Sequence, residues 1–559
     1  MVSTSNDNAT ARPTGTTRRP GRTDPPMLDR DLSRRAAPAD EVLAAAWCSS
    51  LGVPEARPGD NFFELGGDSI TAIKLVAKLR AGGLALRLQD VLDHPTFADL
   101  ASALDGRAVE VEAVKPAVAV PSTTADGSEP TGAVRRVPLV PVQARFLEDD
   151  RLAPDYHNTD AVLELPAGVT VAQVSDALSV LVRRHGVLAV RFDGTGAERT
   201  QEFGHPFDPA TVLEVHEASP EDAETIERIG TVAQEGLSLA DGRVFAARIL
   251  THDGTPWALA LILHHLVGDM LSWSVIASEL GYLLSGDAAA LPPATAYADW
   301  AAYLADRTAA GAFDEHLAYW RARPWSAATG MRTLTEHPDR RLGGLRRHRS
   351  SVELGDAAAF RRLTVELGGN AIVVGAVNYA LNAVYRARTT IVDVVVNGRD
   401  QILDGPDLSR TVGMLAEFAP VVTELGEATD PVAIVRATAA QMRAVPAPFI
   451  AFGALRELAA EPQVRQELRG LPAADIYVNY RGAPLGGETP GALNGLGYSL
   501  GPFQSPKEQQ AYPVRLMVDL DGTVIKSLWK YSATELDEAE MEAVIEAFNR
   551  AIRELVAHC

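Results

Sequence analysis

The chain has 559 residues, more than one hydrophobic core normally organises, so two or three domains are expected. Its formal net charge of −21 leaves no basic surplus, which excludes binding along a nucleic-acid backbone. Two cysteines, Cys48 and Cys559, exclude a disulfide framework and a thiolate metal cluster, and no apolar stretch is long enough to cross a membrane.

The first part of the chain separates into an arm and a small helical region. Residues 1–36 are rich in Thr, Arg, Pro and Asp and hold no hydrophobic signal core. This composition predicts a disordered arm, and the missing signal core favours a cytoplasmic protein. Residues 37–106 carry helical patterns that break at Gly52-Val53-Pro54, Arg57-Pro58-Gly59 and Gly82-Gly83. The breaks predict a four-helix bundle at the start of an α/β multi-domain chain.

One serine in this bundle lies where a helix is expected to begin. Ser69 follows a Gly-Gly bend that can bring the backbone close to a bulky group. The helical pattern that starts beside it consists of Ile70, Ile73, Leu75, Val76 and Leu79. A phosphate esterified to the hydroxyl would face free N–H groups and the positive end of the helix dipole. The alternative is that Asp68 and Ser69 only cap the helix.

The residues around this serine resemble a known attachment site. They read Asn61-Phe62-Phe63-Glu64-Leu65-Gly66-Gly67-Asp68-Ser69-Ile70. This string resembles the phosphopantetheine site of the peptidyl carrier proteins of nonribosomal peptide synthesis, and the resemblance covers about residues 37–105. It implies that Ser69 carries 4′-phosphopantetheine, that a phosphopantetheinyl transferase is a partner, and that the rest of the chain works on thioesters.

Behind the bundle the composition changes twice. Residues 107–136 are dominated by Ala, Val, Pro, Thr and Gly, which predicts an exposed linker. Residues 137–559 alternate apolar helical patterns with short β-branched strands. This stretch exceeds the usual size of a single core, so we expect it to split into two lobes, residues 137–310 and 311–559.

The chemical centre of the large region is an apolar strand that runs into His264 and His265, with Asp269 four residues beyond the second. Neighbouring residues of a strand point to opposite faces, so only one histidine can face a given cavity. Histidine suits proton transfer near neutral pH. The structural alternative is a pair of buried, hydrogen-bonded histidines. The segment offers too few ligands at close spacing, so no metal site is predicted.

This segment continues to Ser272 and Trp273, and the pattern His-His-x-x-x-Asp-x-x-Ser-Trp resembles the condensation superfamily of nonribosomal peptide synthetases. The Ser-Trp ending resembles the epimerisation branch, and the Gly-Gly-Asp-Ser of the bundle resembles carriers that precede epimerisation domains. Further segments that resemble motifs of this family are Val137-Pro138-Leu139-Val140-Pro141-Val142-Gln143, Thr411-Val412-Gly413 with Pro420-Val421, Val478-Asn479-Tyr480 and the closing His558-Cys559.

The resemblance implies a fold and a set of roles. The implied fold is a V-shaped pair of chloramphenicol-acetyltransferase-like lobes, with a tunnel that carrier arms enter from opposite sides. His265 is implied as the active-site base, and Asp269 as a structural partner of Arg399 in a Gly-Arg motif. The residues expected to support the histidine loop without touching substrate are His264, Ser272 and Trp273.

Several other polar residues are candidates for contact with the tunnel, against the alternative that they simply pack. In the later part of the chain these are Asn397, Asn479 and Tyr480. For Tyr480 the alternative is buried aromatic packing. In the opening part the residues with the same two alternatives are Arg145, His157 and Asn158.

The Gly-Arg motif departs from the epimerisation pattern. Epimerisation domains carry Glu-x-His-Gly-Arg, whereas this chain has Val395 at the glutamate position and Asn397 at the histidine position. Inversion of a carbon centre needs proton-transfer groups on both faces, and valine cannot act as one. Asp400 is near in sequence, but an odd offset on a strand would turn it away from the tunnel.

Acyl transfer from a thioester needs only one such group, because one base can position or deprotonate the attacking amine or hydroxyl. The site therefore favours condensation, with epimerisation as the second hypothesis and a non-catalytic docking platform as the third. The chain lacks an adenylation domain, so we expect a separate adenylation enzyme to load it. The acceptor is either another carrier protein or a small molecule, and the choice between amide and ester stays open.

Overall fold

The computed structural model describes residues 39–558, apart from short gaps between residues 52 and 93 and at 106–133, 149–150, 195–198, 336, 356, 401–404, 447–448 and 483–491. Ser69 lies outside the described residues. Of the predicted four-helix bundle, the structure describes α1 (Ala39–Leu51) and α4 (Phe97–Asp105). Trp47 of α1 is fully buried and packs edge-on against the rings of Phe62 and Phe97, with centroids 5.2 and 5.4 Å apart.

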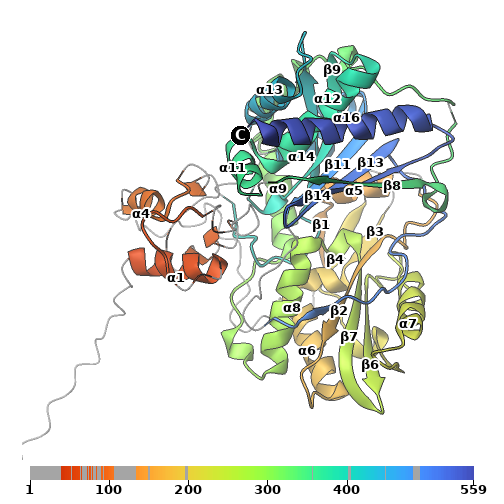
Figure 1. Cartoon of the computed structure of the whole chain (residues 1–559). Coiled ribbons are helices and arrows are strands. Elements are labelled where there is room, and N and C mark those ends of the chain that lie inside the picture. The colour runs from red at the N-terminus through yellow and green to blue at the C-terminus, as the bar shows by residue number, and fades with distance from the viewer. Residues whose placement is uncertain are drawn as a thin grey trace, which may run out of the picture.

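The N-terminal half of the large region is built on a five-stranded sheet in the order β12-β2-β7-β6-β5. Figure 1 labels β2, β7 and β6 of this sheet. Its strands are β2 (Asn158–Glu164), β5 (Leu213–Glu217), β6 (Phe245–His252), β7 (Thr255–His264) and β12 (Gly495–Leu496). Its helices are α6 (Val171–Arg184), α7 (Ala223–Glu235) and α8 (Met270–Leu284).

The central strand β7 is buried on both faces, which explains its unbroken apolar sequence. Ala258, Ala260 and Ile262 pack with residues of α7, whereas Leu259 and Leu261 belong to the core that contains α6 and α8. The two faces alternate along the strand as the pleat requires. The last residue of this rigid strand is His264, so the strand fixes where the histidine pair begins.

The C-terminal half is built on a six-stranded sheet in the order β10-β9-β11-β13-β14-β8. Its strands are β8 (Arg346–Glu353), β9 (Thr389–Val396), β10 (Glu417–Glu424), β11 (Ile476–Gly482), β13 (Val514–Asp521) and β14 (Val524–Tyr531). The helices of its core are α11 (Ala357–Leu367), α12 (Gly369–Tyr385), α13 (Pro431–Arg443) and α16 (Glu538–Ala557).

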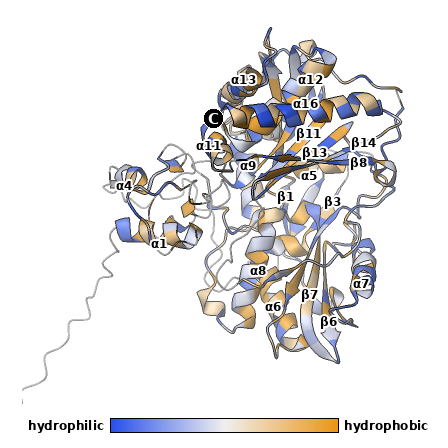
Figure 2. Ribbon diagram, in the orientation of Figure 1, coloured by the Kyte–Doolittle hydropathy of each residue, from blue (hydrophilic) through white to orange (hydrophobic). Residues whose placement is uncertain are grey.

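Only one face of this sheet is covered by those helices. Val392, Val478 and Leu516 point into their core. Helix α16 carries both hydrophilic and hydrophobic residues along its length, as expected for a helix with one buried side (Figure 2). The alternate residues of the same strands therefore lie on the other face of the sheet. We call it the uncovered face because those four helices do not reach it. Part of it packs against the core that joins the two halves, and it carries the polar residues described below.

The core that contains α6 and α8 also joins the two halves. It includes residues of α5 (Pro141–Glu148), α9 (Tyr297–Ala309), α10 (Asp314–Arg321) and α14 (Ile450–Leu458). Beside it lie α15 (Pro462–Arg469) and a small sheet of β1 (Arg135–Pro138), β4 (Thr200–Phe203) and β3 (Arg191–Asp193). Strand β12 crosses from the C-terminal part of the sequence to pair with β2. Gly495–Leu496 therefore belong to the N-terminal sheet although they lie beyond the predicted boundary at residue 310, and that boundary stays a prediction. Among the described residues no helix is both apolar and long enough to span a membrane.

Candidate active site

The two histidines lie at the junction of β7, the short helix His265–Val267 and α8. His264 is fully buried, and its Nε2–H donates to the Pro154 carbonyl at 2.8 Å. Its Nδ1 accepts the backbone N–H of Leu266 at 3.2 Å. Both ring nitrogens are used, and burial is the main cause that lowers the pKa of His264 to about 4. His264 therefore has the supporting place that was predicted for it.

His265 has a different environment. Its ring is only partly buried, and its Nδ1–H donates to the Gly268 carbonyl at 3.0 Å. No hydrogen bond of Nε2 is recorded within the described part of the chain. Burial lowers the pKa of His265 below its ordinary value of 6.5. The ring is therefore neutral at pH 7, with the Nδ1 hydrogen held by the backbone and the Nε2 lone pair directed elsewhere. This is the state that a general base requires.

The predicted ion pair between Asp269 and Arg399 is present. The Arg399 Nη1 and Nη2 groups donate to Asp269 at 2.6 and 2.9 Å, and both residues are buried. Asp269 also caps α8 by accepting the Ser272 N–H at 3.0 Å. Burial opposes ionisation of Asp269, but Arg399 and Ser272 outweigh it and hold the pKa of this carboxyl below its ordinary range.

Ser272 ties the histidine loop to the segment Thr411-Val412-Gly413. Its hydroxyl donates to Asp269 and lies 3.1 Å from both the carbonyl and the N–H of Gly413. A Cβ at Gly413 would overlap the Tyr297 ring, and one at Gly398 would lie 2.0 Å from the Leu415 carbonyl. The glycines of two predicted motifs are thus explained by close backbone packing around the ion pair.

Two further residues brace the loop from the N-terminal half. The Gln143 Nε2 group donates to the Leu266 carbonyl at 3.1 Å, so the opening motif reaches the histidine loop. The indole N–H of Trp273 donates to the hydroxyl of Thr159 on β2 at 3.0 Å. Trp273 therefore makes the kind of supporting contact that was expected of it.

Val395, which replaces the glutamate of the epimerisation pattern, lies on the uncovered face of the six-stranded sheet. Val395 is paired with Phe418 across β9 and β10, and it packs against the core that joins the two halves. Asn397 accepts the Arg399 N–H at 3.1 Å, which shapes the turn of the Gly-Arg motif. No carboxylate stands at position 395, so the side chain there offers no proton.

Asn479 and Tyr480 are neighbours on β11 and therefore lie on opposite faces of the sheet. Tyr480 packs against the helix-covered core, and a Cβ at Gly369 of α12 would overlap its ring. Strand alternation turns Tyr480 toward the helices, as the packing alternative describes, and its contact with the tunnel stays a prediction. Asn479 shares the uncovered face with Tyr477, so contact with substrate stays a prediction.

Asp393 and Tyr512 form a polar cluster with Arg145 on the same face, and these two residues were not among the predicted site residues. Asp393 is buried and accepts the Tyr512 hydroxyl at 2.6 Å, and Arg145 Nη2 lies 3.2 Å from Asp393 and 2.8 Å from the Tyr512 oxygen. Arg145 thus connects α5 to the sheet instead of only packing. The available signal was a single aspartate within the β-branched run of β9, which marks the position of a polar contact.

His157 and Asn158, the other two candidates of the opening segment, lie beside the histidine pair. The His157 ring is 5.6 Å from that of His265, and its carbonyl accepts the His265 N–H at 2.8 Å. Asn158 is buried and donates to the Gln234 carbonyl at 3.0 Å, so packing describes it. His157 is thus next to the candidate base, whereas Asn158 holds the neighbouring strand.

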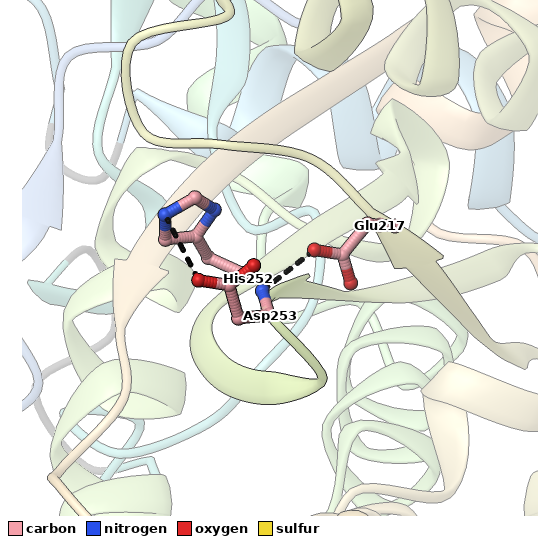
Figure 3. Close-up of side chains that lie close together, drawn as sticks. All are labelled: Glu217, His252 and Asp253. Atoms are coloured by element: carbon pink, nitrogen blue, oxygen red, sulfur yellow. Dashed lines mark hydrogen bonds and ion pairs between the residues drawn. The ribbon is translucent and has the colours of Figure 1, made fainter.

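One group of residues outside this site has the composition of a metal site. Glu217, His252 and Asp253 gather at the β6–β7 turn, and all three are exposed (Figure 3). The Glu217 carboxylate already accepts the Thr251 hydroxyl at 2.7 Å and the Asp253 N–H at 2.7 Å. The turn lies at the opposite end of β7 from the histidines, about 30 Å along the strand. Its contacts stabilise the turn.

Comparison with known proteins agrees with this geometry. The family model described as "Condensation domain" matches residues 134–559. The chain belongs to the condensation-domain family. The model described as "Phosphopantetheine attachment site" matches residues 41–104. The predicted order of a carrier domain followed by a condensation-superfamily domain is therefore confirmed, as is the predicted 4′-phosphopantetheine cofactor. The hydroxyl of Ser69 lies within the matched range and has the chemistry that this attachment needs.

This condensation-domain protein is similar to segments of much longer synthases. It is 27% identical over 551 residues to one of the linear gramicidin synthase proteins of Brevibacillus parabrevis, and the match covers 96% of this chain and 10% of that protein. The chain thus spans about a tenth of that relative's length.

Solved structures support the predicted α/β fold. The epimerization domain from the third module of tyrocidine synthetase B has a TM-score of 0.65 and 18% identity, over 77% of this chain and 98% of that one. The condensation domain of the Monacolin K polyketide synthase MokA has a TM-score of 0.56 and 16% identity, over 76% and 98%.

Proposed function

We propose that this chain works in nonribosomal peptide biosynthesis and transfers an acyl group from the carrier thioester on Ser69 to an amine or hydroxyl. The observation that carries the proposal is Val395, which lies on the uncovered sheet face at the position where an epimerase needs a carboxylate. Condensation-type acyltransferases and epimerases share this fold, so the site residues decide between them.

His265 is the residue that does the chemistry. Its Nε2 lone pair accepts the proton of the attacking amine or hydroxyl and would return it to the thiolate that leaves when the C–S bond breaks. The Gly268 carbonyl holds the opposite nitrogen in the required tautomer. The phosphopantetheine thiol supplies the activated thioester when bound. Asp269 and Arg399 position the start of α8, and through it the loop that carries His265.

The carboxyl groups nearest to position 395 are engaged with other residues. Asp393 binds Tyr512 and Arg145, and Glu417 accepts the Phe418 N–H at 2.9 Å. Burial raises the pKa of Glu417 to about 7, and the Val142 N–H at the start of α5 also donates to it. These contacts support a reaction with one proton-transfer residue.

A second candidate function is epimerisation of the carrier-bound aminoacyl group. Two observations favour it: the likeness to an epimerization domain, and Asp393, which lies two residues before Val395 on the same face of β9. The third hypothesis, a silent docking platform, has least support because the His265 environment suits a base.

The proposed partners are a phosphopantetheinyl transferase, a separate adenylation enzyme, and either a second carrier protein or a small-molecule acceptor. The attachment-site domain supports the first of these. The gramicidin synthase relative is about ten times longer than this chain, which agrees with further synthetase domains acting beside it.

Solvent deuterium separates the two reactions. An aminoacyl group is loaded on Ser69, incubated in D2O with a panel of amines and alcohols, released, and analysed by mass and chiral chromatography. We expect retained configuration, no α-deuterium, and consumption of an acceptor by wild type but not by His265→Ala. α-Deuteration with a D/L mixture and no product with any acceptor would overturn the proposal and support epimerisation.

A matched variant sharpens this test. Val395→Glu restores the carboxylate of epimerisation domains at the same sheet position. We expect no gain in bond formation, because condensation does not use this position, whereas slow α-exchange would show that the geometry of the rest of the site permits inversion. A faster condensation reaction in this variant would contradict the single-base mechanism.

Modification of Ser69 is a separate prediction. Treatment with a phosphopantetheinyl transferase and coenzyme A is expected to add one arm to the wild-type chain and none to Ser69→Ala, as measured by intact-protein mass spectrometry. Ser102→Ala, which changes an exposed serine of α4 in the same domain, serves as the control and should be modified like wild type. An unmodified wild-type chain that remains active would contradict the assignment.

A further inference from the structure

Basic residues form a row on the uncovered face of the six-stranded sheet. In the strand register Arg347 of β8 is opposite Lys530 of β14, which is opposite Arg515 of β13. Arg515 is in turn opposite Tyr477 of β11, beside Asp393 of β9. Neighbouring strands are about 4.8 Å apart, so the row places the Cα atoms of Arg347, Lys530 and Arg515 within about 10 Å of one another.

The row leads toward the candidate base. Arg515 is close enough to His157 and His265 to contribute to lowering the pKa of each, after burial. Its guanidinium lies 5.2 Å from the centre of the Tyr477 ring. In the middle of the row, the Lys530 ammonium is 5.9 Å from the ring of Phe503, which is 48% exposed. The segment after Phe503 returns to the histidines, because Gln504 donates to the His157 ring at 2.9 Å.

No carboxylate balances these cations within the described residues. Two carboxylates of the same face are already engaged: Asp519 is bound by Arg481 at 2.8 and 2.5 Å, and Asp393 by Tyr512 and Arg145. Burial and the neighbouring arginines lower the pKa of Lys530 to about 8. A partly buried cation beside other cations is costly, and an anion from outside would relieve this cost.

We propose that Lys530 and Arg515 form a binding site for an oxyanion of the substrate, a carboxylate or a phosphate, beside His265. The inference rests on the proposed function in that the anion belongs to a molecule reacting at His265. A carboxylate comes from the acceptor or from the loaded acyl group, and a phosphate comes from the carrier arm. Arg515 and Lys530 supply several N–H donors for such an oxyanion, and charge-assisted hydrogen bonds of this kind are strong.

The experiment measures binding without turnover, by isothermal titration calorimetry on the full chain. Three probe pairs each differ in one anionic group: phosphopantetheine and pantetheine, succinyl-pantetheine and butyryl-pantetheine, and glycine and glycinamide. We expect wild type to prefer the anionic member of at least one pair by about tenfold or more, since a hydrogen bond to a charged group is worth that much. The pair that shows the preference identifies the source of the anion.

Matched variants test the residues. Lys530→Met is expected to lose the preference, whereas Lys526→Met, a lysine of the same strand that is paired with Asp521, should keep it. Arg515→Met provides a second site variant, and melting temperatures establish that each variant is folded. Equal binding of both members of every pair by wild type, or a preference that survives in Lys530→Met, would overturn the inference. If the chain binds the anion but exchanges the α-proton in the deuterium experiment and forms no product, this inference stands. Only the proposed acyl transfer is then refuted.

Discussion

Replacement of His265 by alanine is expected to lower turnover of a loaded carrier by about 10²–10⁴-fold, the usual contribution of a general acid–base residue. Its Nε2 is the nitrogen left for substrate, because Nδ1–H is held by Gly268. The partly exposed ring makes few structural contacts, so the melting temperature should stay close to that of wild type. Single-turnover assays and thermal denaturation measure the two quantities.

His264→Ala is the matched contrast. This ring is fully buried and both nitrogens are hydrogen-bonded, so its loss leaves the Pro154 carbonyl and the Leu266 N–H without partners. We expect a lower melting temperature in this variant, which His265→Ala should not show. Full activity in His265→Ala would remove the residue from the mechanism and favour the purely structural alternative.

The pH dependence of the reaction rate is a second test of His265 as the base. A base must be neutral to act, and burial lowers the pKa of His265 below 6.5. Activity should therefore persist at pH 6.5 and fall only as the pH drops through that lowered pKa and the ring becomes protonated. An acid limb above pH 6.5 would indicate a different base.

Replacement of Asp269 by alanine is expected to cost about 3–5 kcal/mol of folding stability, the typical effect of removing one partner of a buried ion pair. The carboxylate accepts from both Nη groups of Arg399, from Ser272 and from the Leu415 N–H at 3.2 Å. Its loss would leave a buried guanidinium uncompensated and the start of α8 uncapped. Activity should fall as well, because the cap sets the loop that carries His265.

A surface pair provides the control for this experiment. Arg321 and Glu467 form a bidentate ion pair, in which Nε and Nη2 of the arginine lie 2.8 and 2.6 Å from the two carboxylate oxygens. Both side chains are largely exposed. Glu467→Ala should therefore cost less than about 1 kcal/mol. Chemical denaturation of both variants gives the comparison. If Asp269→Ala were as stable as this control, the pair would not support the loop.

The pH dependence of stability follows from the lowered pKa of Asp269. A carboxyl whose folded pKa lies below its unfolded value contributes stability above the unfolded pKa, and this contribution is lost as the pH falls through the folded pKa. Wild type should thus lose stability in acid relative to neutral pH, and Asp269→Ala should lose less over the same interval.

Local patterns in the sequence were enough to locate the reactive loop. An apolar strand ending in two histidines predicts one buried and one accessible ring, and the structure has this arrangement in His264 and His265. The resemblance of short motifs to a family paired Asp269 with Arg399, although 130 residues separate them. Strand alternation also places Asn479 and Tyr480 on opposite faces of β11, so only one of the two can face the tunnel.

Other features depend on which strands become neighbours, and no local pattern specifies that. Arg347, Lys530 and Arg515 come from three strands, and only the register of β8, β14 and β13 places them in one row. Asp393 meets Tyr512 and Arg145 because α5 packs across the C-terminal sheet.

The sequence by itself determined the carrier motif around Ser69, the strand that ends at His264, and the absence of a carboxylate at position 395. These depend on side-chain type and on spacing along one segment. The tertiary structure decided which face each strand residue occupies, the exchange of β12 between the halves, and the surplus of positive charge beside His265. These depend on long-range pairing, whose free energy comes from burying surfaces far apart in the chain.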